Sequence, residues 1–538
     1  MALFPPSAIE PFALFPARQE ILSSRTPLLL HEALLPVFLL ILTLLISPYK
    51  SHTRNAVTLP VILALYTRLS YLYSSSHWGI AFCVGAYTYF GSLQAFNLLV
   101  VKDVGRDADV RWVVDDTGFT RGVKHNNGHT NGDIARREKY TNGYTNVNVE
   151  KAVVSNGSTS PSANGSANGN ANGYSNGHAN GHTNGTANGR VDAKPGLGYP
   201  ELSKYPLYQR IRFTVSLIAS SRGVGWKFQV RQIRPAPAPS STLLAFMKTH
   251  FTHILITYVI LDHFGYHISI DPYFTKSDCW KSPFHTSPLS PDDWRDQCLP
   301  SFVPRTSTAA FIYHHIFRKH LTLISVYAIL TQLFSIAAIL FTVPIPITGP
   351  SSWAPLFGPV SQATSLRGFW TSCWHSIFKK GFSYPGEWLA FRVLGLDRRN
   401  VWAQVIVVLA AFINSGGLHG LGCWTQNGRG IAAAGFFFLQ PFGFLGEAAV
   451  FKLLKVANVD RKSGLGTFLT TSWMMAWGLW SCDVFFYDFL HGGVGGSEPV
   501  AWSAWRWWVG EQAYRWAPPG EWMRWDSEGS LWGWGVRV

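Results

Sequence analysis

The stretch "VWAQVIVVLAAFINSGGLHGL", residues 401–421, carries no charged side chain and is long enough to cross a bilayer as one helix. A helix needs about 20 predominantly apolar residues to span the hydrocarbon core. The stretch also holds a histidine, His419, and several glycines. Each glycine costs a helix about 1 kcal/mol relative to alanine. The stretch therefore predicts a transmembrane helix with an ionisable group inside, a combination that usually marks a pathway or a reacting site.

Similar apolar runs recur along the 538 residues. They predict an all-α, multi-pass integral membrane protein with about eight transmembrane helices. The first run has too long an apolar stretch and too few preceding basic residues for a cleaved signal peptide, so we expect it to remain as an anchor. The predicted spans are residues 27–47, 56–73, 78–101, 243–264, 321–343, 401–421, 431–454 and 468–490.

The composition agrees with a membrane location. Only 14% of the residues are charged, against roughly 25% in an average soluble domain. The net charge of +15 arises mostly from Lys and Arg in loops beside the apolar runs, and the sequence has no basic helix interleaved with aromatic residues that would bind nucleic acid. We interpret the basic residues as topology signals and expect a lipid bilayer, and no nucleic acid, as a partner.

The positive-inside rule orients the spans. Lys50 and Arg54 place the loop after the first span in the cytosol, which puts the amino terminus in the lumen if the protein resides in the endoplasmic reticulum. The loop with Cys279 and Cys298 is then lumenal, where the thiols either pair or stay free. The six cysteines form no CxxC pair or zinc-ligand spacing, so no metal site is expected.

Between residues 102 and 200 the composition changes to Asn, Gly, Ser, Thr and His. Such a segment cannot bury enough apolar area to offset the entropy of ordering it, so we expect a disordered cytosolic insertion. A Trp-rich tail over residues 498–538 follows the last span. Indole rings suit the membrane–water interface, where we expect this tail to lie.

A second segment of interest is "SLRGFWTSCWHSIFKKGFSYP", residues 365–385. Its aromatic residues recur at helical spacing and two lysines close the run, which predicts an amphipathic helix at the interface or entering the fold. His375 follows Trp374 on the aromatic side of this helix. The residues alone leave two interpretations open: a partly buried imidazole bonded to a backbone carbonyl, or a group of a reaction site.

In the opening stretch, Ser415 and His419 are four residues apart and share a face of the predicted helix. Close packing against neighbouring helices explains the glycines, but it does not explain the imidazole. Imidazole has an ordinary pKa near 6.5 and can act as a general base at neutral pH. Because the sequence has no GxSxG elbow, direct acyl transfer to a hydroxyl is favoured over a covalent acyl-serine route.

The two segments together carry a family resemblance. "RGFWTSCWHSIFKK", residues 367–380, followed by "INSGGLHGLG", residues 413–422, resembles the wax-synthase-like branch of the membrane-bound O-acyltransferase superfamily. That branch carries an "FW...WH" segment and then an intramembrane "SGxxH". "RGVGW", residues 222–226, and the pair Leu261 and Asp262 are also similar to its fungal members.

The resemblance departs from the family pattern at one place. Wax synthases usually have basic residues between the first Trp and the "WH" pair, where this chain has Thr371, Ser372 and Cys373. An acyl chain or CoA held as in the plant enzymes is therefore not implied. The resemblance covers roughly residues 223–490.

This resemblance implies a domain organisation around a buried reaction chamber. Residues 201–497 would be the acyltransferase core with five or more spans. Residues 1–101 would be a transmembrane extension of three spans, residues 102–200 an insertion, and residues 498–538 the tail.

The resemblance also implies roles for individual residues. His419 is expected to be the catalytic base, and His375 its catalytic partner in the chamber. The cationic residues near His375 are expected to meet the CoA phosphates, although anchoring at the interface remains an alternative for them. The expected substrate-binding residues are Ser415, Asn414, Trp374 and Trp370, and the expected CoA-binding residues are Arg367, Lys379 and Lys380.

The implied activity is transfer of an acyl group, acetyl by analogy with fungal relatives, from acyl-CoA to a hydroxyl of a hydrophobic small molecule. The acceptor would be a terpenoid or polyketide of secondary metabolism, with acetyl-CoA as co-substrate and no cofactor. One alternative is a long-chain wax or steryl ester synthase. Another is a transporter with His419 as proton relay, which predicts an internal repeat that the sequence lacks.

Overall fold

The computed structural model describes residues 24–46, 51–75, 77–107, 198–230, 243–280, 287–493 and 499–511, with isolated positions and two short strands outside these ranges. Most of the predicted insertion at 102–200 and most of the tail lie outside the described residues. Residues 1–120 and 195–538 cluster as one compact unit. The first three predicted spans therefore belong to the same unit as the predicted core.

The described fold is almost entirely helical. Strands are limited to the two-residue parallel pair of β1 (Thr26–Pro27) with β2 (Tyr73–Ser74) and the antiparallel pair of β3 (Arg524–Asp526) with β4 (Gly535–Arg537) among the described residues. The α-helices are α2 (Leu30–Ile46), α3 (His52–Leu72), α4 (Trp78–Phe96), α5 (Tyr199–Leu202), α6 (Leu207–Ala219), α7 (Leu243–Ile270), α8 (Pro272–Thr275), α9 (Pro291–Cys298), α10 (Ser307–Phe311), α11 (Lys319–Thr342), α12 (Leu366–Gly368), α13 (Lys379–Glu387), α14 (Val401–Asn427), α15 (Ile431–Val456), α16 (Gly464–His491) and α17 (Ala504–Trp508).

Shorter π and 3-10 segments join several of these helices. Each of the four π segments described continues directly from an α-helix, and η4 makes α10 and α11 one continuous rod. The π segments are η2 (Asn97–Val101), η4 (Ile312–Arg318), η7 (Phe369–Cys373) and η8 (Trp388–Val393), and the 3-10 segments are η3 (Ser277–Cys279), η5 (Pro350–Ser352) and η6 (Val360–Gln362).

Each predicted span coincides with a helix. Four described helices are long and apolar enough to cross a membrane by length and composition: Leu243–Ile270, Ser307–Thr342, Val401–Asn427 and Ile431–Val456. Helix α2 is apolar but shorter. The predicted all-α membrane fold is confirmed, whereas the predicted number of eight spans is not, because α3, α4 and α16 are not among these four.

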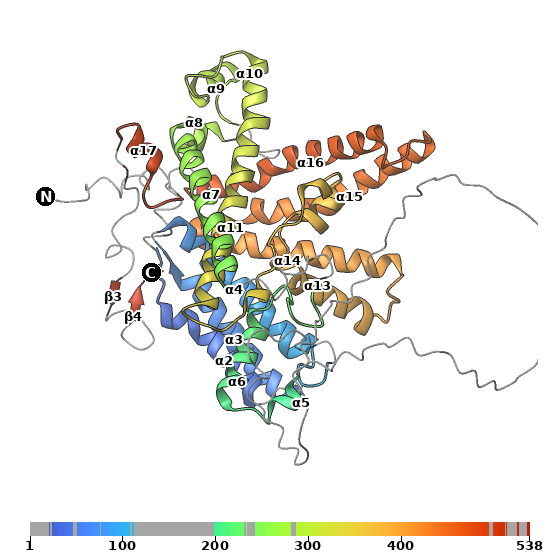
Figure 1. Cartoon of the computed structure of the whole chain (residues 1–538). Helices are drawn as coiled ribbons and strands as arrows, with labels where there is room; N and C mark the ends of the chain where they lie inside the picture. The colour runs from blue at the N-terminus through green and yellow to red at the C-terminus, as the bar shows by residue number, and fades with distance from the viewer. Residues whose placement is uncertain are drawn as a thin grey trace, which may run out of the picture. The chain divides into compact units, whose positions relative to one another are not determined.

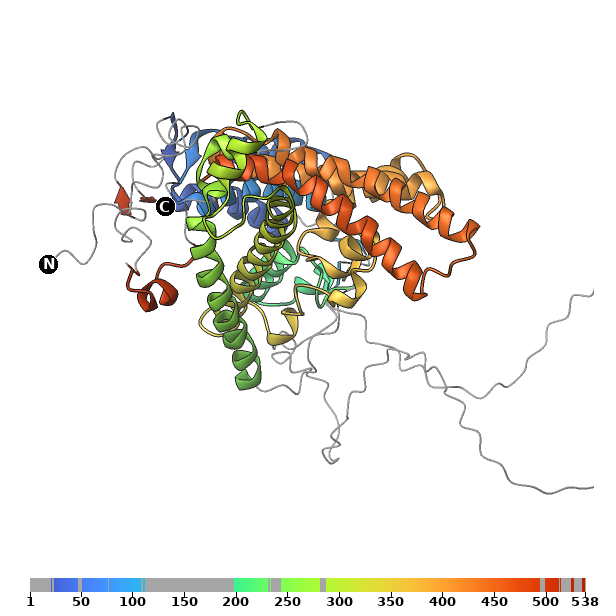
Figure 2. The same ribbon diagram turned by 90° about the horizontal axis from the view of Figure 1, so that it is seen from above.

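Helix α14 occupies the centre of the described fold. It packs against α4, α13 and α15, and α15 packs in turn along α16. Helices α7 and α11 run side by side as another pair, as Figures 1 and 2 show from two directions. The opening stretch is therefore the helix around which its neighbours assemble.

Helix α4 and the short strand β2 before it contact α14 directly. The hydroxyl of Thr425 donates a hydrogen bond to the carbonyl of Ala81 over 2.8 Å. The hydroxyl of Ser74 donates to the carbonyl of Thr425 over 2.9 Å. Helix α4 thus contacts α14 directly, and it contributes side chains to the cavity described below.

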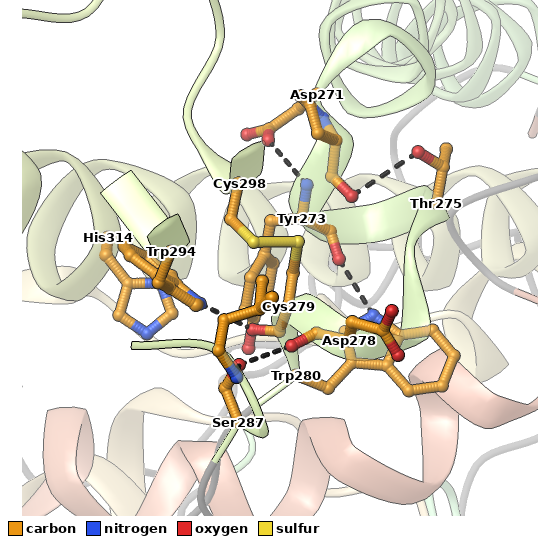
Figure 3. Close-up of a disulfide and its surroundings, with 12 residues drawn as sticks. Asp271, Tyr273, Thr275, Asp278, Cys279, Trp280, Ser287, Trp294, Cys298 and His314 are labelled. Carbon is orange, nitrogen blue, oxygen red and sulfur yellow. Dashed lines mark hydrogen bonds between the residues drawn. A yellow bond between two sulfur atoms is a disulfide. The ribbon is translucent and has the colours of Figure 1, made fainter. Parts of the chain in front are cut away.

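A disulfide closes the loop between α8 and α9. Cys279 and Cys298 are bonded, which resolves the two alternatives that the sequence left open. The indole of Trp294 donates to the carbonyl of Cys279 over 2.9 Å, and that of Trp280 donates to the carbonyl of Tyr273 over 2.8 Å (Figure 3). These contacts make a small buried core in the loop that was predicted to be lumenal.

Helix α17 of the Trp-rich tail docks on α7. The carboxylate of Asp262 accepts a hydrogen bond from the backbone N–H of Trp505 over 2.8 Å. The guanidinium of Arg506 donates to the hydroxyl of Ser269 over 2.6 Å. Asp262, which the family resemblance singled out, therefore holds the start of α17.

Candidate active site

A large cavity of about 1940 Å³ lies beside α14. Side chains from α4, α11, α13, α14, α15 and α16 line it, together with the segment between η7 and α13. Both His375 and His419 line this cavity. The two histidines, 44 positions apart in the sequence, are thus brought to a common space.

The glycines around His419 let two neighbouring helices approach α14. A Cβ added at Gly416 would lie 2.6 Å from the ring of Phe438, and one at Gly420 would lie 2.9 Å from the carbonyl of Gly430, both toward α15. On the α4 side, a Cβ at Gly422 would overlap the ring of Phe82. Close packing accounts for these glycines, and it fixes the position of His419 between α4 and α15.

Replacing Gly422 with alanine should destabilise the protein. The new methyl group would meet Phe82, and overpacking of this kind costs about 1–3 kcal/mol. The matched control is Gly478→Ala in α16, where a Cβ meets nothing within 4 Å and the gain in helix propensity favours the fold. The midpoint of thermal unfolding in detergent measures the stability of both variants. A midpoint for Gly422→Ala at or above the wild-type value would contradict this packing.

Three phenylalanine rings enclose the imidazole of His419. The ring of Phe437 stacks on it with centroids 4.5 Å apart and an interplanar angle of 16°. Phe485 meets it edge-on at 5.4 Å, and Phe82 lies tilted at 5.9 Å. Its Nδ1 is buried without a hydrogen-bond partner among the described residues, so Nε2 is the nitrogen that a group in the cavity can reach.

The amphipathic helix predicted for the aromatic run that Lys379 and Lys380 close is wrong, because the run is interrupted. The chain forms α12 and η7, leaves helical geometry at Trp374 (φ −67°, ψ 157°), and resumes a helix only at Lys379. The ammonium of Lys379 donates to the carbonyl of Thr371 over 2.8 Å, which satisfies a carbonyl near the end of η7. The break places His375 on an extended segment facing the cavity.

His375 sits in an aromatic pocket at this break. The rings of Phe357 and Trp374 contact it, with centroids 5.9 and 5.3 Å away. Burial, and secondarily the positive charge of Arg222, lowers the pKa of His375 to about 4, so the ring is neutral at physiological pH. Its Nδ1 is buried and has no hydrogen-bond partner in the described part of the chain, contrary to the interpretation of an imidazole bonded through this atom to a backbone carbonyl.

Two residues before His419 in α14, Asn414 and Ser415, were predicted to bind substrate, and only one of them lines the cavity. Ser415 lines the cavity. Asn414 does not, because its side chain is used within the protein: the amide nitrogen donates to the carbonyls of Phe382 and Ala410, and the oxygen accepts from the hydroxyl of Tyr89 at 3.0 Å. Asn414 joins α14 to α4 and α13.

Trp370 and Trp374, which were predicted to bind substrate, both line the cavity. The indole of Trp370 donates to the side-chain oxygen of Gln440 over 3.2 Å, and the indole of Trp477 donates to the same atom. Gln440 is buried in the span α15. Sequence analysis missed Gln440, although a polar residue inside an apolar helix is the same signal that identified His419.

The predicted CoA-binding cations also line the cavity, and further basic residues join them. Lys102 and Lys380 both lie over the ring of Tyr384, at 4.6 and 5.0 Å from its centroid. Glu387 pairs with Lys380 at 3.3 Å. We call the cavity-lining cations of this region the basic cluster: Lys102, Lys227, Arg367, Lys379, Lys380, Arg392 and Arg398. Four of the seven were not predicted, because they lie outside the motif and only the folded chain brings them to the cavity.

Two buried ion pairs lie at the start of α11. Arg318 pairs with Asp271 at 2.6 Å, and Lys319 pairs with Asp483 of α16 at 2.8 Å. His314, His315 and Asp483 offer ligand atoms within 4.8 Å of one another. The Lys319 ammonium lies against both His315 and Asp483 and already supplies positive charge there. We interpret this group as an ion-pair network that links α11 to α16.

Comparison with known proteins shows that the part of the chain that carries the site is similar to one family. Residues 353–439, which include both histidines, match the Membrane bound O-acyl transferase family. The chain is 24% identical over 277 residues to the acetyltransferase eriL of Hericium erinaceus, covering 50% of this chain and 65% of that protein. It is 25% identical over 282 residues to the acetyltransferase ple2 of Rhodocybe pseudopiperita, covering 51% and 66%.

A third relative carries a different name. The O-Mevalon transferase yanI of Aspergillus niger is 22% identical over 264 residues, which cover 47% of this chain and 52% of that protein. The chain thus spans less than two thirds of the length of each of these curated relatives. No solved structure matches it significantly.

Proposed function

We propose that this chain is a membrane-bound O-acyl transferase, as its match to that family over residues 353–439 supports, and that it transfers an acyl group from acyl-CoA to a hydroxyl of a hydrophobic small molecule. One observation carries the proposal: a single cavity is lined by His375, by His419 and by the basic cluster. Acyl transfer from acyl-CoA uses a general base, a hydrogen-bond donor for the oxyanion and a site for phosphates, and these residues can supply all three.

In the proposed reaction His419 is the base. Its Nε2 accepts the proton of the acceptor hydroxyl while the hydroxyl oxygen attacks the thioester carbonyl carbon. The C–S bond then breaks, the acyl group remains on the acceptor oxygen as an ester, and the CoA thiolate takes the proton back from His419. The stacked ring of Phe437 holds the imidazole in one orientation during both proton transfers.

His375 serves as the partner of His419. Because burial keeps it neutral, it can donate one N–H hydrogen bond to the oxygen on which negative charge develops. A donor already in place in an apolar cavity stabilises an oxyanion better than a donor in water does. The aromatic pocket formed by Phe357 and Trp374 holds the imidazole of His375 in place for this hydrogen bond.

The donor and the acceptor would use different parts of the cavity. Phosphate groups favour the basic cluster, and the phenylalanines around His419 favour an apolar acceptor. The names of the relatives support acetyl as the acyl group, and we extend this to a terpenoid or polyketide alcohol of secondary metabolism. We also propose the endoplasmic reticulum as the location.

Lys379 gives this proposal a pH signature. Burial, and secondarily the neighbouring Lys380, lowers the pKa of Lys379 to about 8. The ammonium is charged below that value and loses its proton as the pH rises through it, so attraction for the CoA phosphates weakens. We expect kcat/KM for acetyl-CoA to fall with a midpoint near this pKa in wild type. Lys379→Arg should remove the fall, and identical profiles for the two proteins would contradict the role of Lys379.

The proposed function is tested by product identification. Membranes containing the protein are incubated with candidate alcohols and either radiolabelled acetyl-CoA or radiolabelled palmitoyl-CoA, and labelled esters are extracted and identified. An acetyl ester that is absent from His419→Ala membranes supports the proposal. A palmitoyl ester favours the long-chain alternative, which the large cavity also accommodates. No ester from either donor contradicts the proposal.

A further inference from the structure

Arg222, in the "RGVGW" motif, is a buried cation with an unusual environment. Its guanidinium donates to the carbonyls of Ala354 and Pro355 over 2.7 and 2.6 Å and to the hydroxyl of Ser376 over 3.2 Å. The residue is 7% exposed. Among the described residues no carboxylate pairs with it. Burying a charge without an opposite charge is costly, so the fold retains Arg222 at the expense of stability.

The contacts of Arg222 fix both sides of the His375 pocket. Ser376 follows His375 in the chain. Ala354 and Pro355 begin the segment that carries Phe357, whose ring contacts His375. Arg222 does not line the cavity, so it lies behind these two segments and acts through them.

The motif around Arg222 is built for this position. Gly223 and Gly225 have φ values of +66° and +81°, which favour glycine. The ring of Trp226 is buried against Phe213 with centroids 5.0 Å apart. The tight turn and the buried indole therefore hold the backbone at Arg222 in one conformation.

We propose that Arg222 is a positioning residue that holds His375 at the cavity and supplies a fixed positive charge to the negative charge formed during acyl transfer. This inference rests on the proposed function. The charge persists at neutral pH, because burial lowers the pKa of Arg222 only to about 10. A fixed charge at a buried site stabilises a developing oxyanion and a departing thiolate without rearrangement.

The charge of Arg222 is tested by following the titration of His375 directly. Diethyl pyrocarbonate modifies neutral imidazole, so its rate at His375, measured by peptide mass spectrometry against pH, gives the midpoint of protonation. The charged or titratable groups that act on this ring are Arg222 and His419. Removing the positive charge in Arg222→Gln should raise the midpoint by about half a unit to one unit, and Arg222→Lys should leave it nearly unchanged.

Turnover measurements complete the test. We expect Arg222→Gln to lower kcat by roughly 10- to 100-fold with little change in KM for acetyl-CoA. Arg212→Gln is the matched control, because Arg212 also donates to a carbonyl, that of Ile347, and its charge is not among those that act on His375. Unchanged kcat together with an unchanged midpoint in Arg222→Gln would overturn the proposal.

Two safeguards keep the test decisive. If Arg222→Gln does not fold, Ser376→Ala removes one contact and keeps the charge, and kcat should fall by about fivefold, the worth of one hydrogen bond; an unchanged kcat would overturn the positioning role. If wild type transfers no acyl group, the proposed function fails, while the titration of His375 still decides whether Arg222 acts on that ring.

Discussion

His419→Ala should lower kcat for acyl transfer by about 10² to 10⁴, the usual contribution of a general base. The side chain lines the cavity and no other imidazole of α14 can replace it, since this helix has one histidine. His419→Gln should lose activity to a similar extent, because an amide keeps the approximate size of the side chain but cannot take the proton. Turnover is measured per mole of folded protein in detergent or in microsomes.

The control for His419 is another cavity-lining histidine. His320 lines the same cavity, but its Nδ1 lies 2.7 Å from the carbonyl of Ile316 in its own helix. His320→Ala should keep near-normal turnover. Normal turnover in His419→Ala would show that the base is a different group.

His375→Ala should lower kcat by about 10² to 10³, the effect of removing one oxyanion donor. His375→Asn should retain more activity than the alanine variant, because the asparagine amide can still donate a hydrogen bond into the cavity. The KM for acetyl-CoA should change little in either variant. Steady-state kinetics with acetyl-CoA as the varied substrate separates the two parameters.

The pattern across the His375 variants distinguishes a role in the reaction from a role in folding. If alanine and asparagine reduce only the amount of folded protein, with kcat per folded molecule unchanged, His375 is a packing residue of its aromatic pocket. Rescue by asparagine alone points to hydrogen-bond donation.

The helices could be predicted from sequence because length and apolar character act locally. Residues 401–421 were predicted as a span, and the structure extends that helix to Asn427. The irregular segment at His375 could not be predicted. The aromatic spacing of residues 369–378 imitates a helix, and the break depends on contacts such as the one between Lys379 and the carbonyl of Thr371.

The placement of Asn414 was within reach of sequence reasoning. At 100° per residue, five positions separate Asn414 from His419 by about 140° around the helix, whereas four positions separate Ser415 from it by about 40°. The serine therefore shares the cavity face and the asparagine does not, as the structure shows. Helical periodicity alone would have predicted that Ser415 lines the cavity and that Asn414 does not.

Other parts of the site depend on tertiary contacts. No local pattern links Lys102 or Arg398 to the cavity, since the segments after η2 and η8 meet there only in the folded chain. The partners of the α14 glycines are likewise residues of α4 and α15. The sequence could show that close packing was needed, but not which helices approach.

The central claim is that the cavity holds acyl-CoA with its acyl carbon between the two histidines. The most direct test is a cryo-electron microscopy structure with a non-hydrolysable thioether analogue of acetyl-CoA. The account predicts the phosphates at the basic cluster and the carbonyl carbon within about 3–3.5 Å of the place where an acceptor oxygen would contact Nε2 of His419. An analogue bound with its acyl end away from both His419 and His375 would contradict the account.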